Sequence, residues 1–467
     1  MSLTADVGEF IAGVTDASVP EDVRRLAKRS ILDGIGLAVA GSRSAAARIA
    51  RREIEGYGEL HREATVLGTD LALPARFAAF LNGLAIHADD YDDTQLATLP
   101  DRVYGLLTHP TAPVLPAVLA LGERDDRSGR DALLAYLIGV EVETKVAEAI
   151  DPRHYSHGFH STGTAGTIGS AAAASRLLGL NPSTTRVALG IAASQAGGLR
   201  ENFGTMTKPF HAGRAAESGV LAASLASADF TAATNILEAK RGFFRAAGGG
   251  YDRTMIDGRL GNPWTFADPG VSIKPHPSGS LTHPAMGAFL DLVLENDLRP
   301  ADVKRIRIGT NKHMPTALIH HRPADELAAK FSMEFCLAIL LLERRAGLAE
   351  FKDEVVNRAD VQAMITRITF EADPAADEGG FREMTSLIDV ELNDGRLIRA
   401  RAEFAKGSPA NPMRDDELED KFLQCLAWAG IHEGVGRDVA ARVMALEDQP
   451  SVRSVLEPLS HTLMQAH

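Results

Sequence analysis

STGTAGTIGSAAAASRLLGL, residues 161–180, is the stretch that decides the fold. Its side chains are nearly all small, and small residues let helix backbones approach closely. The glycines are spaced much as in a phosphate-binding loop, but no G-x-x-x-x-G-K-[ST] motif is present and no predicted strand precedes them. The stretch therefore predicts a helix over 162–178 in the core of a tightly packed bundle.

Helical periodicity continues on both sides of this stretch. Helices are predicted over 74–87, 111–121, 130–150, 183–196 and 212–228, and near the C-terminus over 415–429 and 437–446. After about residue 258 the pattern changes to alternation. Strands are predicted over 303–310 and 364–373, with a hairpin over 386–404 around Asn393-Asp394-Gly395 and helices over 284–295 and 331–346.

The order of these segments predicts a mainly α protein with a discontinuous organisation. A chain of 467 residues exceeds the usual size of one domain. We expect an all-α helical domain formed by residues 1–260 and 408–467, with an α+β lid domain, residues 261–407, inserted between them. The turn-rich linker at 407–412 marks the return to the helical domain.

Composition excludes several classes of function. Lys and Arg total 49 against 62 Asp and Glu, a net charge of −13, which argues against a nucleic-acid partner. No apolar run reaches the ~20 residues of a membrane helix, and the N-terminus lacks the features of a signal peptide. Cys336 and Cys425 stand alone in apolar text, which favours buried thiols over a metal or disulfide framework. We expect a soluble cytoplasmic protein.

HADDYDDT, residues 87–94, is the densest polar cluster and contains Asp90 and Thr94. Four carboxylates within five residues favour a raised pKa at one of them, which could then act as a base. A solvated loop is the simpler alternative, although negative charge at a helix C-terminus opposes the helix dipole. A DDxxD metal motif is a further alternative, but its only acidic counterpart, 415–420, is typical of the first turn of a helix. We predict no metal site.

Two histidine clusters lie directly before predicted helices. His109 precedes the helix at 111–121, where the dipole would lower its pKa and leave a neutral ring able to accept a proton. Residues 154–161, HYSHGFHS, include Tyr155 and His160, and their spacing matches no standard zinc motif.

Two further clusters combine lysine with histidine. Lys208 and His211 lie at the entry to another helix, where cations suit an anionic substrate. Lys274 and His283 lie where the second domain begins, so this segment could close over a cleft. There is no Rossmann fingerprint, nucleophile elbow, kinase motif or pyridoxal context. These clusters of histidine, lysine and aspartate favour an enzyme that moves a proton to or from a small polyanionic substrate without a cofactor.

Together these segments resemble the MmgE/PrpD family. The matching segments run in family order over nearly the whole chain: HADDYDDT (87–94), HPTAPVLPA (109–117), GFHSTGTAG (158–166), TKPFHAGRAA (207–216), IKPHPSGSLTHPA (273–285), AKFSMEFCLA (329–338) and GSPANPM (407–413). The resemblance implies a helical domain with an inserted lid, a site between them, no cofactor and a homodimer. It also implies a site built from Asp90, Thr94, His109, His160, Lys208 and Lys274.

The sequence departs from the family pattern at three places. Fifteen positions separate Thr94 from His109, which implies an enlarged loop; Gly279 stands where relatives often carry cysteine or histidine; and His276 replaces a usual aromatic residue. A missing side chain at Gly279 removes one possible acid for a leaving group.

We therefore favour a cofactor-independent epimerase of the iminodisuccinate type acting on a small di- or tricarboxylate. Lys208 and Lys274 would stabilise the enediolate, and Asp90, His109 and His160 would carry protons. Thr94, Tyr155, His211 and His283 would help to bind the substrate. A hydro-lyase or decarboxylase acting on 2-methylcitrate or cis-aconitate is the alternative enzyme, and a helical dimer that binds carboxylates without catalysis is the alternative of another class.

Overall fold

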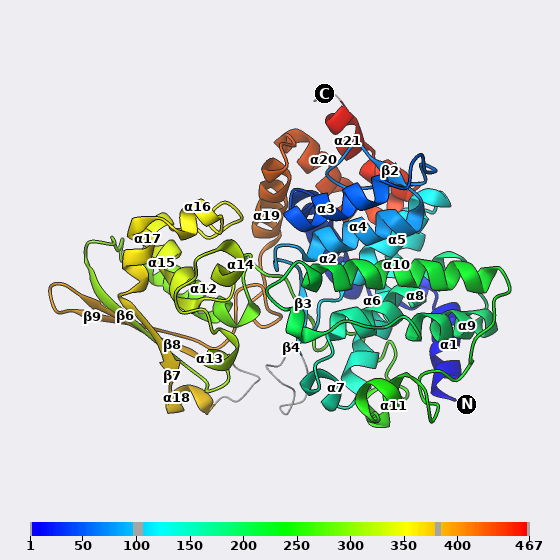
Figure 1. Ribbon diagram of the computed structural model, residues 1–467, viewed down its shortest axis with the longest axis horizontal. Helices are drawn as coiled ribbons and strands as arrows, with labels where there is room; N and C mark the ends of the chain where they lie inside the picture. The colour runs from blue at the N-terminus through cyan, green and yellow to red at the C-terminus, as the bar shows by residue number, and fades with distance from the viewer. Residues whose placement is uncertain (1, 97–105, 379–383, 465–467) are drawn as a thin grey trace.

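The computed structural model describes residues 2–96, 106–378 and 384–464. The described chain forms a large helical body and a smaller unit with a sheet, which lie side by side in Figure 1. The predicted fold class, a mainly α protein that carries a small α+β unit, is confirmed.

The helical body is built from both ends of the chain. Its helices are α1 (Leu3–Gly13), α2 (Glu21–Gly41), α3 (Ala45–Glu55), α4 (Ala75–His87), α5 (Thr111–Arg124), α6 (Gly129–Ala149), α7 (Arg153–Ser156), α8 (Ser161–Leu177), α9 (Pro182–Ala193), α10 (Thr207–Ser227), α11 (Phe243–Gly248), α19 (Asp415–Trp428), α20 (Glu433–Met444) and α21 (Val452–Met464). In Figure 1 the orange and red C-terminal helices return to the blue N-terminal ones, where α19 packs against α2.

Small residues set the distance between the central helices. A Cβ atom added to Gly213 of α10 would lie 2.4 Å from the carbonyl oxygen of Phe80 in α4, and one added to Gly219 would lie 2.2 Å from Ser170 Oγ in α8. Side chains at these positions would force the helices apart. The tight packing predicted for the small-residue helix is therefore confirmed at α8, and α10 packs in the same way against both α8 and α4.

The smaller unit contains a four-stranded sheet in the order β7-β6-β8-β9. Strand β6 (Val303–Thr310) pairs parallel with β7 (Ile368–Ala372) and antiparallel with β8 (Ser386–Leu392), and β8 forms the predicted hairpin with β9 (Leu397–Ala402). The unit's helices are α12 (His283–Glu295), α13 (Met314–Ala317), α14 (Glu326–Ala329), α15 (Met333–Glu343), α16 (Asp353–Val356), α17 (Ala359–Ile365) and α18 (Pro374–Asp377).

Each unit has its own hydrophobic core. The first core extends from Leu3 to Ile273 and resumes from Met413 to Leu459, whereas the second extends from Ala285 to Leu392. The chain thus crosses between the cores twice. Within the described residues, no helix is long and apolar enough to span a membrane.

Several predicted elements differ in their bounds, and two of these differences have a plain local cause. Helix α10 begins at Thr207 rather than at 212, because Pro209 is tolerated in the first turn of a helix. The strand predicted over 364–373 is confined to β7, since the residues before it form α17.

Short strands link the two units beside the helix ends. A two-stranded pair, β1 (Ala64–Thr65) and β2 (Ala72–Leu73), lies apart from this link. Strand β3 (Thr94–Leu96) pairs with β4 (Leu106–Thr108) on one side and with β5 (Val271–Ser272) on the other. The pairing of Thr94 with Ser272 places the segment that starts at Lys274 next to the acidic cluster.

Candidate active site

A cavity of about 310 Å³ lies between the helical body and the smaller unit. The residues that line it from the two sides are Asp90, Thr108, His109, Tyr155, His160, Thr162, Arg200, Phe203, Gly204 and Lys208 from the helical body, and Lys274, Gly279, Ser280, Leu281, Thr316, Ala317, Leu318, Ile319, His320, Phe331 and Met384 from the segment after β5. All four predicted catalytic residues therefore face one space.

Helix ends deliver the polar side chains to this cavity. The acidic cluster follows the C-terminus of α4, His109 precedes α5, His160 is the N-cap of α8, and Lys208 lies in the first turn of α10. Because α4, α8 and α10 pack closely, residues far apart in the sequence converge.

Asp90 joins the two lysines of the site. Its Oδ1 lies 2.5 Å from Lys208 Nζ and its Oδ2 lies 3.2 Å from Lys274 Nζ, which also donates to the Asp90 carbonyl oxygen at 2.7 Å. Burial alone would raise the pKa of Asp90, but the two lysine charges outweigh it and hold the pKa well below its usual value. Asp90 also has a φ of 51°, an uncommon conformation for a residue other than glycine.

His109 presents an unprotonated nitrogen to the cavity. Its Nδ1–H donates to the Asp93 carbonyl oxygen at 3.0 Å, so the neutral ring has its lone pair on Nε2. Its backbone N–H donates to Thr162 Oγ1 at 3.1 Å. These two bonds fix both the tautomer and the place of the ring.

His160 contacts a second histidine. Its Nδ1 and that of His211 lie 3.1 Å apart in a hydrogen bond, and its ring meets Phe203 edge-on with 4.9 Å between centroids. His211 does not line the cavity, although it was predicted to bind substrate; it contacts the site through His160.

The histidines are neutral, as predicted, but for a different physical reason. Burial is the main effect that holds the pKa values of His109 and His160 well below their usual value, followed by repulsion from nearby imidazoles and from Lys208. Helix dipoles were the predicted cause.

The acidic cluster does contain carboxyl groups with raised pKa values, as predicted. Burial raises the pKa of Asp92 and that of Asp93 to about 7. Asp93 accepts hydrogen bonds from the Thr111 backbone N–H at 3.2 Å and from its hydroxyl at 2.6 Å. Asp90, chosen from the sequence as a proton carrier, is instead the carboxylate that two lysines keep ionised, so it is a poor base.

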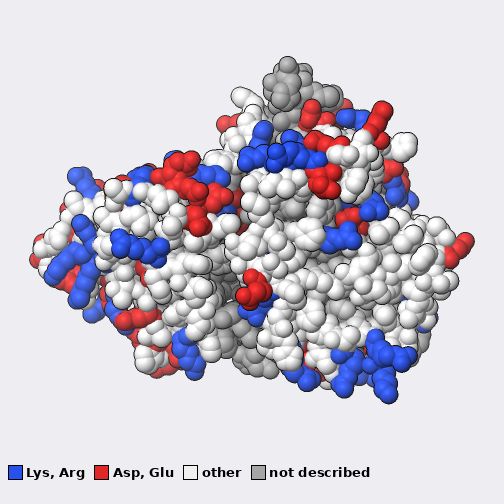
Figure 2. Space-filling view, in the orientation of Figure 1, with Lys and Arg blue, Asp and Glu red and all other residues white. Residues whose placement is uncertain are grey.

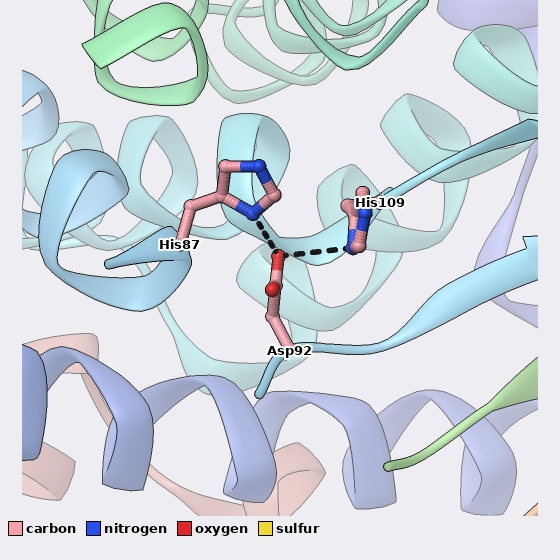
Figure 3. A group of neighbouring side chains, drawn as sticks. All are labelled: His87, Asp92 and His109. Atoms are coloured by element: carbon pink, nitrogen blue, oxygen red, sulfur yellow. Dashed lines mark hydrogen bonds and ion pairs between the residues drawn. The ribbon is translucent and has the colours of Figure 1, made fainter. Parts of the chain in front are cut away.

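His87, Asp92 and His109 form a group of buried side chains of which His109 alone is among the described residues that line the cavity (Figure 3). Asp92 Oδ2 lies 2.7 Å from His87 Nδ1 and 3.4 Å from His109 Nδ1. The spacing would admit a metal ion. Hydrogen bonds account for the contacts equally well, and the nearby charges of Lys208 and Lys274 oppose a further cation, so we assign no metal role.

The DDxxD alternative is not favoured by the contacts of its carboxylates. Asp89 pairs with Lys330 Nζ at 2.8 Å, and Asp90 pairs with two lysines. The acidic counterpart at 415–420 begins with Asp415, which pairs with Arg25 and Arg29.

Besides His211, two residues predicted to bind substrate, Thr94 and His283, are not among the described residues that line the cavity. Thr94 is buried in β3, where its backbone pairing with β5 positions Lys274. His283 is buried and its Nε2 shares a hydrogen bond of 3.1 Å with Ser278 Oγ. Both side chains are buried within their own elements, which keeps them out of the described lining of the cavity.

Tyr155 lines the cavity, as predicted, next to Arg200, which sequence reasoning missed. The Arg200 guanidinium lies 3.7 Å from the Tyr155 ring centroid and donates to its carbonyl oxygen at 2.9 Å. The sequence around Arg200, GGLREN, is typical of a loop and contains no motif that would indicate a functional residue.

Gly279 lines the cavity beneath an aromatic ring. A Cβ atom at this position would lie 3.2 Å from Phe331 Cδ1, so the ring would have to shift by a few tenths of an ångström to admit a side chain. Phe331, Leu281, Leu318 and Met384 add an apolar wall that no sequence motif indicates. His276 donates to the Ala346 carbonyl oxygen at 3.0 Å and does not line the cavity. The loop expected to be enlarged between Thr94 and His109 lies largely in 97–105, outside the described residues.

Comparisons with known proteins identify the family of the chain. The chain matches the MmgE/PrpD N-terminal domain over residues 5–255 and the MmgE/PrpD C-terminal domain over residues 276–442. It is 32% identical to the human cis-aconitate decarboxylase, over 91% of this chain and 89% of the relative. It is 30% identical to the mouse cis-aconitate decarboxylase (90% and 86%) and 27% identical to that of Aspergillus terreus (98% and 96%). Family-model matches over most of the chain, with a relative at this identity, establish that the chain belongs to the MmgE/PrpD family.

Proposed function

We propose that the chain is a cofactor-independent enzyme that decarboxylates a small tricarboxylate of the cis-aconitate type. The observation that carries the proposal is that two lysines and two neutral histidines line one cavity. The names of the relatives support decarboxylation as the overall reaction.

The cavity carries an excess of positive charge. Of its described lining residues, Lys208, Lys274 and Arg200 are cationic and Asp90 is anionic, so the balance is 3 − 1 = +2. A polycarboxylate would offset this charge, and Asp90 holds the two ammonium groups side by side at the distances given above. The lysines are our candidates for binding the carboxylates and for stabilising the charge that develops on them.

The histidines would handle the proton. When the C–C bond to one carboxylate breaks, CO₂ leaves and the electron pair spreads over the neighbouring carboxylate. Carbon then takes a proton from His109 or His160. Both rings are neutral in the empty site, but the negative charge of the bound substrate cancels lysine charge and raises their affinity for a proton.

Epimerisation of a dicarboxylate remains the second candidate. It needs two proton carriers on opposite faces of one carbon. His109 and His160 come from different helix ends, and Gly279 offers no side chain as an extra acid. Each reaction passes through a carbanion that a neighbouring carboxylate and the lysines would stabilise.

We predict that the protein, after exhaustive chelation, releases CO₂ from cis-aconitate in D₂O and leaves deuterium on a product carbon. Mass spectrometry and NMR of the product measure both. Deuterium exchange without CO₂ across a panel of di- and tricarboxylates would favour the epimerase. If no acid in the panel released CO₂ or exchanged deuterium, the result would favour the carboxylate-binding dimer that lacks catalysis. Activity lost on chelation and restored by Mg²⁺ or Zn²⁺ would restore the metal hypothesis.

We also propose a homodimer formed through the helical body. Figure 2 shows that the face of this body around α10 carries few charged side chains, and Phe210 of α10 is 42% exposed. Light scattering at micromolar concentration should give about twice 49.8 kDa. Phe210→Glu should weaken the dimer, whereas Leu397→Glu, at a 48% exposed site on β9, should not. A monomeric wild type would contradict the proposal.

A further inference from the structure

Two buried residues that do not line the cavity contact its proton carriers from behind. The His87 ring lies 4.6 Å from the His109 ring and 5.7 Å from the His160 ring, measured between centroids. Asp92 Oδ2 lies 2.7 Å from His87 Nδ1, whose N–H donates to the carboxylate when Asp92 is ionised, and 3.4 Å from His109 Nδ1 (Figure 3). His87 is 1% exposed and Asp92 is fully buried.

We propose that Asp92 and His87 are positioning residues shared by the two proton carriers, and that Asp92 supplies the negative charge that compensates His109 when its Nε2 takes up a proton. The inference rests on the proposed proton transfer at His109. The proton comes from solvent or substrate and resides on His109 Nε2, while the charge on Asp92 is unchanged by the step.

The charges of the neighbouring groups single out Asp92 for this role. Lys208 and Lys274 disfavour a positive ring at His109, and the carboxylate of Asp90 is already shared between those lysines. Among the described residues, only His87 and His109 lie within ion-pair distance of Asp92.

Asp92 and His87 each have one buried polar atom that makes no hydrogen bond among the described residues. Within the described residues, Asp92 Oδ1 and His87 Nε2 are buried without a hydrogen-bond partner. Such atoms cost stability, and a catalytic role is one reason for a protein to retain them. An Asp92 whose second oxygen is unbound can strengthen its interaction with His109 without breaking another contact.

Asp93 provides a matched control. It is the next residue, it is equally buried, and burial raises its pKa to about 7 as well. However, its carboxylate bonds to Thr111 and not to a ring of the site. Lys208, Lys274 and Asp90 act on Asp92 from the cavity side, and Asp33 of α2 faces it from the other side.

The test is a pH titration, followed by NMR, of the ring ¹⁵N chemical shifts of His87 and His109 in full-length protein labelled with ¹⁵N-histidine. The variants His87→Gln and His109→Gln assign the signals. In the wild type both chemical shifts should change together, with a midpoint near pH 7, the pKa of Asp92. The shift should vanish in Asp92→Asn and persist in Asp93→Asn. A midpoint that survives Asp92→Asn, or that Asp93→Asn also removes, would overturn the proposal.

A second variant covers the case in which Asp92→Asn does not fold. His87→Leu removes the N–H beside Asp92, which should raise the midpoint seen at His109; an unchanged midpoint would count against the pairing. With an active substrate, Asp92→Asn should lower turnover by about 10- to 100-fold with little change in KM. Because the titration needs no substrate, it separates this inference from the proposed function.

Discussion

Replacing His109 with glutamine should lower turnover by about 10²–10⁴-fold, the usual contribution of a general acid or base. His109 lines the cavity, and the hydrogen bond from its Nδ1 to the Asp93 carbonyl oxygen leaves Nε2 as the reactive atom. Glutamine can preserve much of the shape and can donate to the same carbonyl oxygen, but it cannot carry a proton. Steady-state kinetics on the acid that the wild type accepts would measure the loss.

His276→Gln is the matched control for this substitution. His276 is also a neutral histidine that donates from Nδ1 to a backbone carbonyl oxygen, and burial lowers its pKa to about 4. It lies outside the cavity, so the same change of side chain should leave turnover within a few-fold of the wild type. Equal losses in the two variants would show that the effect of His109→Gln is structural.

His160→Gln distinguishes the two candidate reactions. In a decarboxylase, one histidine delivers the proton, so one of the two variants should lose far more activity than the other. In an epimerase, each histidine serves one face of the carbon. Each variant should then abolish interconversion but keep solvent exchange of the α-proton in one enantiomer.

The architecture of the helical body could be predicted from sequence because local signals carry it. The small residues of 161–180 indicate both a helix and its close packing. Gly219 shows the same requirement where α10 faces α8, and Gly213 shows it where α10 faces α4. The hairpin of β8 and β9 is likewise marked by its alternation and by the turn at Asn393-Asp394-Gly395.

The division of roles within the acidic cluster could not be predicted in this way. Asp90 and Asp92 are two residues apart and have the same side chain. Which of them meets lysine depends on the backbone turn at Asp90 and on the pairing of Thr94 with Ser272, which brings Lys274 from 184 residues away. Neither feature leaves a local signal.

The apolar side of the cavity was missed for a similar reason. Phe331 and Met384 belong to the smaller unit, and their place at the site follows from how the two units pack. The family resemblance gave the polar residues, because those recur in motifs. It gave no indication of Arg200, which reaches the site from a loop through its contact with Tyr155.

Lys208→Met should have the second large effect, because it removes a charge partner of the substrate in both the ground state and the transition state. Lys208 Nζ lies 2.5 Å from Asp90 Oδ1 at the cavity wall. Its loss would leave Asp90 to neutralise Lys274 alone. We expect turnover to fall by about 10²–10³-fold, as for the loss of one donor to a developing anion, together with a rise in KM.

Two comparisons make this result specific to the site. Lys208→Arg keeps the charge but not the compact ammonium, so it should restore binding more than turnover. Lys330→Met removes a lysine that pairs with Asp89 at 2.8 Å but does not line this cavity, and it should leave both parameters nearly unchanged. If Lys208→Met raised KM alone, Lys208 would bind the substrate without stabilising the transition state. Lys274 would then be the residue that stabilises the carbanion. Its ammonium group donates to the backbone carbonyl oxygen of Asp90 and pairs with the Asp90 carboxylate.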